Sequence, residues 1–334
     1  MVLFGKTAKQ WRRGGPGTHM ITKNRQPDSV IHEMIRKAFP EKTATDIQEL
    51  TEGMCNVTYN ITFSDGEECI LKIAAKDTTG NTSNEIRLMT AEVKAMQLVR
   101  EHCTFHVADV LAYDCSRTIC DGDYFFMEKL PGVNYSFIKE NLPEETRRGI
   151  AREIGEISRQ LRRITNPQFG FLGDTKRYDH LSDFVHTMLR NLITDGQKKN
   201  VDLGCDVEKL LEEFEEEKYI FDEVPSATLV HWDMWEGNVF VEGEHVSGII
   251  DWERAMWGEA FMDDRFRKHS RNKDFLEGFG QKDFSETELM RIRWYDIILY
   301  LTMMVEVFYR EFEDKGQYFW AKEQFLSVLH REAT

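Results

Sequence analysis

Residues 229–241, with the sequence LVHWDMWEGNVFV, place a histidine, an aspartate, a glutamate and an asparagine between two short apolar segments. His231, Asp233 and Asn238 form the pattern H-x-D-x-x-x-x-N, and Asp251 follows at the end of the segment SGIID. If the short strand after Asn238 pairs with the SGII segment as a hairpin, the hairpin and the loop before it bring Asp233, Asn238 and Asp251 to one end of the strand pair. A carboxylate and an amide oxygen at that end suit Mg²⁺, which prefers oxygen ligands.

This arrangement matches what phosphoryl transfer requires. A metal ion neutralises the phosphates, and a separate carboxylate, here Asp233, faces the attacking hydroxyl. Each residue alone has a simpler explanation, because an aspartate after a strand is common in turns and an asparagine can cap one. The ordered set between two strands is more specific than any of its members and predicts a functional site.

The chain before this motif predicts a small β-rich lobe. The alternation of residues 57–63 (VTYNITF) indicates the middle one of three antiparallel strands between residues 49 and 75. A helix is expected over residues 84–101, because its apolar residues recur at helical spacing. Two further strands, residues 107–114 and 124–130, complete this lobe.

The chain after a Pro-Gly linker is mostly helical, with the hairpin as its one embedded strand pair. This succession predicts an α+β fold with two lobes. We expect a small N-terminal lobe over residues 20–130 and a larger helical C-terminal lobe over residues 131–334. Residues 1–19 are basic and show no apolar periodicity. We therefore expect them to form a disordered leader outside the fold.

Composition excludes some classes of partner. The formal net charge is −15 over 334 residues, so the chain is not expected to bind nucleic acid or an anionic membrane. The 6 cysteines form no C-x-x-C pair and no secretory signal is visible, which indicates a reduced cytoplasm. The apolar run at residues 297–308 is too short to span a bilayer and contains Glu306, so it predicts a buried helix.

Two motifs carry a resemblance to a known family. HWDMWEGN at residues 231–238 and IIDWERAMWGEAFMDDRF at residues 249–266 resemble the aminoglycoside/choline kinase-type phosphotransferases, small-molecule relatives of the protein kinases. The resemblance extends from about residue 47 to the C-terminal helices. It implies a protein kinase-like fold, ATP and Mg²⁺ as cofactors, and a small hydroxylated molecule as the substrate. The N-terminal lobe would then be the nucleotide-binding lobe.

The resemblance also implies roles for single residues. Asp233 matches the catalytic base, and Asn238 and Asp251 match the Mg²⁺ ligands. Lys72 matches the strand lysine that contacts the phosphates, and Glu92 matches the helix glutamate that pairs with this lysine. Glu85, in the same expected helix, is the competing candidate for that pairing.

Other residues would support the nucleotide or the catalytic loop. The phosphate loop would comprise Gly53, Met54, Cys55 and Asn56, although it has a single glycine where protein kinases have three. The adenine would lie against the hinge residues Met127, Glu128 and Leu130. His231 and Asp263 match residues that orient and brace the catalytic loop.

The substrate is the least defined part of the prediction. No A-P-E-like activation segment follows Asp251, which disfavours a protein substrate. Glu253, Glu259 and Asp264 near the hairpin, together with an acidic run at residues 206–224, suggest an amine-bearing compound such as an aminoglycoside. The alternatives are a macrolide, a sugar amine, choline or homoserine as the substrate, or a non-catalytic nucleotide-binding module. The residues assigned to the substrate side are Glu253, Trp257 and Asp264.

Overall fold

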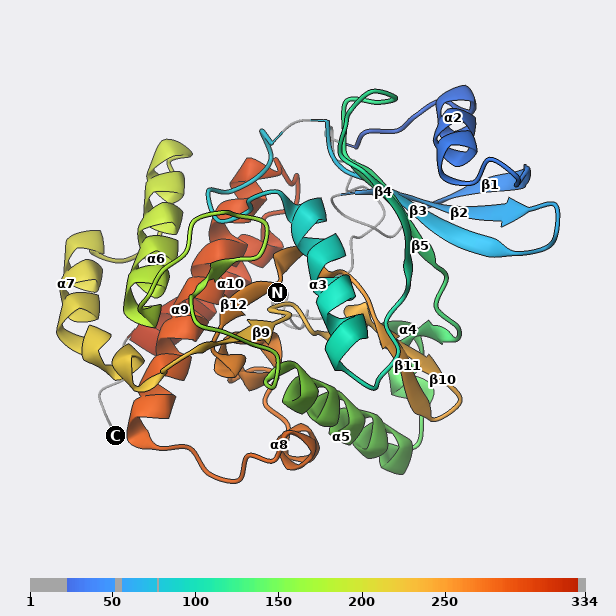
Figure 1. Ribbon diagram of the computed structural model, residues 1–334. Helices are drawn as coiled ribbons and strands as arrows, with labels where there is room; N and C mark the ends of the chain where they lie inside the picture. The colour runs from blue at the N-terminus through green and yellow to red at the C-terminus, as the bar shows by residue number, and fades with distance from the viewer. Residues whose placement is uncertain (1–22, 52–55, 77, 330–334) are drawn as a thin grey trace, which may run out of the picture.

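A computed structural model describes residues 23–51, 56–76 and 78–329 of the chain. The expected leader, residues 1–19, and three phosphate-loop residues, Gly53, Met54 and Cys55, lie outside the described residues. The described chain has an N-terminal region built on one antiparallel sheet and a C-terminal region that is mostly helical (Figure 1). This is the two-lobed α+β, kinase-like fold that the motifs predicted.

The N-terminal sheet has five strands in the order β1-β2-β3-β5-β4. Its strands are β1 (Ala44–Leu50), β2 (Val57–Phe63), β3 (Glu68–Ile73), β4 (Val110–Asp114) and β5 (Tyr124–Glu128). In β2 the alternate residues Val57, Tyr59, Ile61 and Phe63 are all buried, as their alternation predicted. Burial of one face fixes the register of the sheet and therefore the direction in which each β3 side chain points.

Two helices pack against this sheet, and one of them was not anticipated from the sequence. Helix α2 (Asp28–Ala38) buries Ile31, Met34 and Ile35 against the β1–β2 part of the sheet (Figure 1). Helix α3 (Leu88–His102) begins four residues later than expected. The residues before Leu88 form a loop instead, because Arg87 adopts a left-handed backbone conformation with φ 44° and ends the helix there.

The C-terminal region contains two small sheets among its helices. One has the order β11-β10-β6 and the other the order β7-β9-β12-β8. The strands are β6 (Val133–Asn134), β7 (Thr165–Asn166), β8 (Gly170–Phe171), β9 (Ala227–Val230), β10 (Val239–Glu242), β11 (His245–Ile249) and β12 (Met256–Gly258). Apart from the apolar segment before His231, which forms β9, only the β10–β11 pair was expected, since the remaining strands have two or three residues and leave no periodic pattern.

The helices of this region form the larger part of the core. They are α4 (Tyr135–Ile138), α5 (Glu144–Leu161), α6 (Leu181–Lys198), α7 (Val207–Glu217), α8 (Lys273–Phe279), α9 (Glu286–Tyr309) and α10 (Gly316–Leu329), with short 3-10 turns η1 (Lys139–Asn141), η2 (Lys218–Glu223), η3 (Glu236–Asn238), η4 (Trp252–Arg254), η5 (Ala260–Met262) and η6 (Asp264–Phe266). Ser285 caps α9 by accepting a hydrogen bond from the Glu288 amide. Almost all of α9 from Ile292 to Val307 is buried, as expected. No helix in the described ranges is long and apolar enough to cross a membrane.

The two regions meet where β5 continues into β6. Gly132 lies in this connection with φ +86°, and a Cβ there would come within 2.3 Å of the Val241 carbonyl oxygen. Only glycine fits both the backbone conformation and this close approach. The connection therefore fixes the N-terminal sheet against the β10 strand that follows the catalytic loop.

Candidate active site

His231 organises the loop that follows β9. Its ring is fully buried and lies against Trp252, with a distance of 4.4 Å between ring centroids. Nδ1 accepts a hydrogen bond from the Asp233 amide at 3.2 Å, so Nε2 carries the proton and donates to the Ile250 carbonyl at 3.0 Å. Burial lowers the pKa of His231 to about 4. The histidine is therefore neutral at pH 7 and links the loop to the end of β11.

Asn238 closes the same loop from its other end. Its side-chain amide donates to the Asp233 carbonyl oxygen at 2.8 Å, and its own carbonyl accepts from the Ile250 amide at 3.0 Å. Strands β10 and β11 pair with Val239 opposite Ile249. The hairpin thus brings Asp233, Asn238 and Asp251 to one end, as the sequence predicted.

Asp263 braces this loop in the manner that the resemblance implied. Its Oδ2 accepts a hydrogen bond from the Trp232 amide at 3.1 Å, and burial raises its pKa to about 7. Trp232 has φ +75° and Asp251 has φ +66°, a conformation that non-glycine residues rarely adopt. Two such residues beside the predicted base and metal ligand are typical of a site whose geometry the surrounding fold imposes.

A buried ion-pair cluster joins the two regions of the chain. The Lys72 ammonium lies 2.8 and 2.7 Å from the two carboxylate oxygens of Glu92 and 2.7 Å from Oδ1 of Asp251. Burial disfavours the charged ammonium, but the Asp251 and Glu92 carboxylates outweigh it and raise the pKa of Lys72 well above its usual value. Burial raises the pKa of Glu92 to about 7, while that of Asp251 is lowered by Lys72 against the effect of burial.

Glu92, and not Glu85, is therefore the partner of Lys72. The carboxylates of Glu92, Asp251 and Glu253 have oxygens within 4.8 Å of one another. Such an all-oxygen set suits a hard divalent cation, and Asn238 lies beside it through the Ile250 contact. These residues fit the Mg²⁺ that the resemblance implies, with Glu253 as a candidate ligand that sequence reasoning placed elsewhere.

Glu253 contacts the segment expected to form the phosphate loop, which differs from the substrate-side expectation for this residue. Its Oε2 accepts a hydrogen bond from the Asn56 side chain at 2.8 Å, so its carboxylate faces the expected phosphate-loop segment. Burial, followed by the nearby Asp251 carboxylate, raises the pKa of Glu253. Asn56 is the one expected phosphate-loop residue that the structure describes.

Of the other two substrate-side assignments, Trp257 differs from expectation, whereas Asp264 lines a large groove beside the loop that carries Asp233. Trp257 is 6% exposed and belongs to the core, where its backbone in β12 lies opposite Leu229 and Gly170. Asp264 is 3% exposed, and its carboxylate lies 3.5 Å from Nε2 of His269. Sequence position alone could not show these orientations, because the chain reverses direction several times after Asp251.

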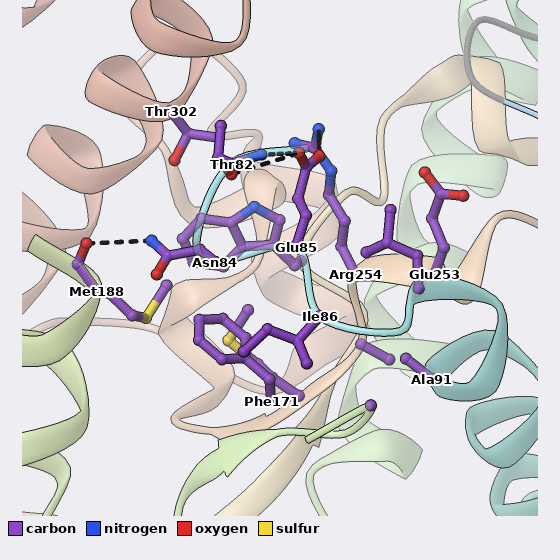
Figure 2. A pocket seen from close by; sticks show the side chains of 15 residues that line it. Thr82, Asn84, Glu85, Ile86, Ala91, Phe171, Met188, Glu253, Arg254 and Thr302 are labelled. Atoms are coloured by element: carbon purple, nitrogen blue, oxygen red, sulfur yellow. Dashed lines mark hydrogen bonds and ion pairs between the residues drawn. The ribbon is translucent and has the colours of Figure 1, made fainter. Parts of the chain in front are cut away.

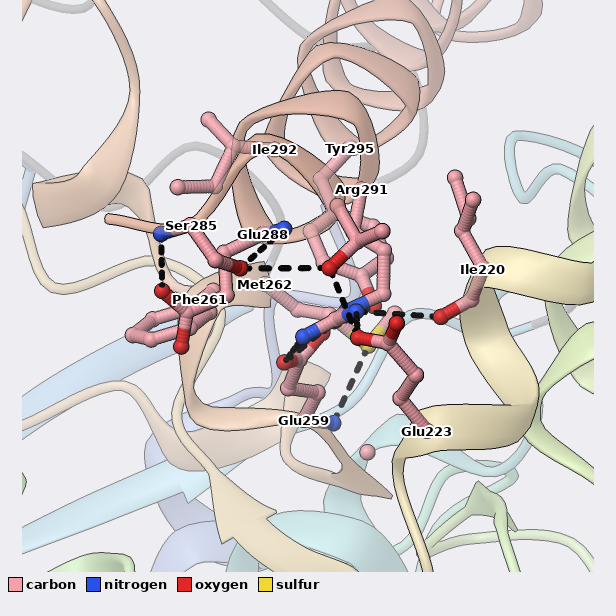
Figure 3. A network of polar contacts seen from close by, with 12 residues as sticks. Ile220, Glu223, Glu259, Phe261, Met262, Ser285, Glu288, Arg291, Ile292 and Tyr295 are labelled. Carbon is pink, nitrogen blue, oxygen red and sulfur yellow. Dashed lines mark hydrogen bonds and ion pairs between the residues drawn. The ribbon is translucent and has the colours of Figure 1, made fainter. Parts of the chain in front are cut away.

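The acidic residues that suggested an amine-bearing substrate are occupied elsewhere. Glu259 forms a buried ion pair with Arg291 at 3.0 Å and accepts a hydrogen bond from the Tyr295 hydroxyl at 2.5 Å (Figure 3). Glu223, from the end of the acidic run, also contacts Arg291, at 2.9 Å (Figure 3). The run itself forms α7 and η2, and α7 lies across the molecule from the β10–β11 hairpin (Figure 1).

The expected hinge residues form the end of β5 and the connection after it. Met127 pairs with Ile70 of β3 and Val110 of β4. The Glu128 amide donates to the Asp109 carbonyl at 2.9 Å, and the Leu130 side chain is buried. These residues therefore lie at the junction of the two regions.

A second charged cluster was missed from the sequence and supports α3. Glu85 Oε1 lies 3.0 Å from Nη2 of Arg254 and 2.5 Å from Nη2 of Arg310, and Glu306 contacts both arginines at 2.7 and 3.6 Å. Figure 2 shows Glu85 and Arg254 at one end of a pocket that also includes Thr82 and Asn84. The sequence feature that could have indicated this cluster is Glu306, a charged residue within an apolar helical run.

The loop before α3 is attached to the C-terminal helices as well. The Ser83 amide and hydroxyl donate to Asp195 of α6 at 2.6 and 2.8 Å, and the Asn84 side chain donates to the Met188 carbonyl at 3.1 Å (Figure 2). The start of α3 is thus fixed to the larger region, while Glu92 further along the helix contacts Lys72 of the sheet. Helix α3 therefore positions Glu92 relative to Asp251.

The fold and this site define a kinase-like enzyme that transfers a phosphoryl group to a small molecule. The model of the phosphotransferase enzyme family matches residues 46–263, well over half of the chain. The chain therefore belongs to this family. A comparison with curated proteins finds no match.

Solved structures share the fold at low sequence identity. A protein assigned as a fructosamine-3-kinase from Haemophilus somnus 129PT has a TM-score of 0.66 and 14% identity, covering 90% of this chain and 97% of the other. A thermostable mutant of aminoglycoside phosphotransferase APH(4)-Ia, in a ternary complex with AMP-PNP and hygromycin B, has a TM-score of 0.66 and 14% identity, covering 91% and 99%. At this identity the likeness shows the fold alone.

Proposed function

We propose that the protein is an ATP-dependent phosphotransferase that moves the γ-phosphoryl group of ATP to a hydroxyl of a small molecule. The observation that carries this proposal is the contact of Lys72 with both Glu92 and Asp251, because it joins the sheet, α3 and the catalytic hairpin in one cluster. A bound nucleotide would lie between the two regions, with its adenine near Met127 to Leu130. The AMP-PNP complex of a structural neighbour supports ATP as the donor.

Different residues act on the nucleotide and on the acceptor hydroxyl. Lys72 provides a positive charge for the phosphates, and Glu92 holds that ammonium in place. Asp251 and Asn238, joined by Glu253, would hold Mg²⁺, which when bound neutralises charge on the transferring phosphoryl group.

Asp233 accepts the hydroxyl proton or orients the hydroxyl. Its backbone is fixed on both sides by His231 and Asn238. A positioned base contributes about 10²- to 10⁴-fold to the rate.

The five cysteines within the described residues are free thiols, which supports a reduced cytoplasm as the location. The intact set of charged residues speaks against the alternative of a non-catalytic nucleotide-binding module. An amine-bearing substrate is supported by the hygromycin B and streptomycin complexes of structural neighbours, but no longer by Glu259 or the α7 run.

The test is the release of ADP from MgATP by the full chain in the presence of aminoglycosides, amino alcohols, sugars and sugar acids. Substrate-dependent ADP release, with one phosphate added to the substrate by mass spectrometry, is the expected result. ATP binding without transfer to any compound of the panel would favour the non-catalytic module.

A further inference from the structure

A large groove lies beside the loop that carries Asp233. Its volume is about 860 Å³, and its walls include Trp235 and Glu236, which follow Asp233 by two and three residues. The other walls come from α4, η1, α5, the segment after Asp263, and α10. The pocket in Figure 2, by contrast, has a volume of about 30 Å³, which is too small for a substrate.

The charge of this groove is opposite to that of the whole chain. The chain has a net charge of −15, yet the groove is lined by more basic than acidic side chains. Among the lining residues that are not exposed, three are acidic, namely Glu236, Asp264 and Asp274. Four are basic, namely Lys139, Arg147, Arg148 and Arg265. Such a local reversal in an acidic protein attracts anions and repels amines.

Two of the three acidic residues of the wall that are not exposed are already paired with cations. Glu236 contacts Lys139 and lies 3.7 Å from Arg265, and Asp274 lies 3.1 Å from Arg148. These carboxylates are thus neutralised from within the protein and do not offer a site for a ligand amine. Two further acidic residues of the wall, Glu140 and Glu144, and two further basic residues, Arg271 and Lys273, are exposed, where water weakens the field of each.

Some of the cations retain unused donors. Arg265 is 8% exposed, and although its Nε donates to the Met234 carbonyl at 2.6 Å, its Nη2 has no hydrogen-bond partner in the described part of the chain. A buried guanidinium N–H without an acceptor is costly and indicates a missing partner. Neither Arg147 nor Lys273 forms an ion pair with a carboxylate among the residues that the structure describes, and both line the groove.

We infer that the phosphate acceptor is an anionic hydroxyl compound, one that carries a carboxylate or phosphate group held in this groove by Arg147, Arg265 and Lys273. This inference rests on the proposed function, since it identifies the substrate class of the same site. The groove adjoins the loop that carries Asp233, so an anion bound there can present a hydroxyl to that carboxylate. The inference replaces the amine-bearing class that the sequence suggested.

Two tryptophans of the groove, Trp235 and Trp320, give a readout that does not need turnover. The full chain is titrated with glucose, glucosamine, gluconate and glucose 6-phosphate at constant ionic strength while tryptophan fluorescence is followed. These compounds share a six-carbon skeleton and differ in charge, and the last two separate carboxylate from phosphate recognition. We expect a saturable change with at least one anion and weaker binding of glucosamine.

The double variant Arg147→Gln/Lys273→Gln should weaken anion binding about tenfold or more, which corresponds to about 1.4 kcal/mol. Arg159→Gln is the matched control, because Arg159 is exposed on the same helix and does not line the groove. Tighter binding of glucosamine, no response to either anion at millimolar concentration, or anion binding unchanged in the double variant would each overturn the inference. Anion binding without transfer from MgATP would contradict the proposed function while leaving the groove assignment in place.

Discussion

Replacement of Glu85 by glutamine tests whether the loop before α3 supports catalysis. The Glu85 side chain is 5% exposed and its carboxylate is shared by Arg254 and Arg310. Glutamine keeps the size of the side chain but removes its charge. The two buried guanidinium groups would then share the single carboxylate of Glu306.

The size of the effect follows from this geometry. Removing one partner of a buried ion pair costs about 3–5 kcal/mol, and we expect about 3 kcal/mol because Glu306 still contacts both arginines. Since the loop leads into α3, Glu92 should also lose part of its position relative to Asp251. We expect kcat to fall at least about tenfold, because small displacements of catalytic groups strongly reduce the rate of reaction.

The assay combines urea unfolding with steady-state phosphoryl transfer. Glu67→Gln is the control, because Glu67 is 72% exposed and pairs with Lys42 at the surface, where ion pairs contribute little. The control should match the wild type in both measurements. A Glu85→Gln variant with wild-type stability and wild-type kcat would refute the role assigned to this cluster.

Three other perturbations address the site and the chain terminus. Asp251→Ala should weaken magnesium-dependent ATP binding in calorimetry, because it removes a carboxylate from both Lys72 and the metal; unchanged binding would place the metal elsewhere. The pKa of His231 is about 4 in the folded state against an ordinary 6.5, so the unfolded state binds a proton first as pH falls. Stability should therefore drop by about 3 kcal/mol between pH 6.5 and pH 4 from this residue, and His231→Gln should lose less over the same range in urea unfolding; equal losses would contradict this. Deletion of residues 1–19 should leave both stability and ADP release unchanged, and a loss of either would show that this segment joins the fold.

Features that depend on local pattern were predictable from the sequence. The alternation in β2 identified its buried face, and the order His231, Asp233, Asn238 and Asp251 identified the hairpin, because each signal lies within one short continuous segment of the chain, residues 57–63 and 231–251. Helix α2 was missed because a single amphipathic helix of 11 residues near the start of the chain was not separated from the leader.

Features that depend on distant contacts were not predictable. Glu85 and Glu92 lie in one segment, and only the fold shows that the first pairs with Arg254 and Arg310 and the second with Lys72. Three of the acidic residues after Asp251 were interpreted as part of the substrate side, because their position in the sequence does not show which distant residues they contact. Their partners, Asn56 for Glu253 and Arg291 for Glu259, come from other parts of the chain.

The central claim is that Asp233 acts on the acceptor hydroxyl while the nucleotide is held by other residues. Its most direct test is Asp233→Asn, measured as kcat for the best acceptor together with the calorimetric affinity for MgATP. We predict a loss in kcat of about 10²-fold or more with MgATP affinity nearly unchanged. A variant that retains near wild-type kcat, or that loses turnover only because MgATP no longer binds, would contradict the claim.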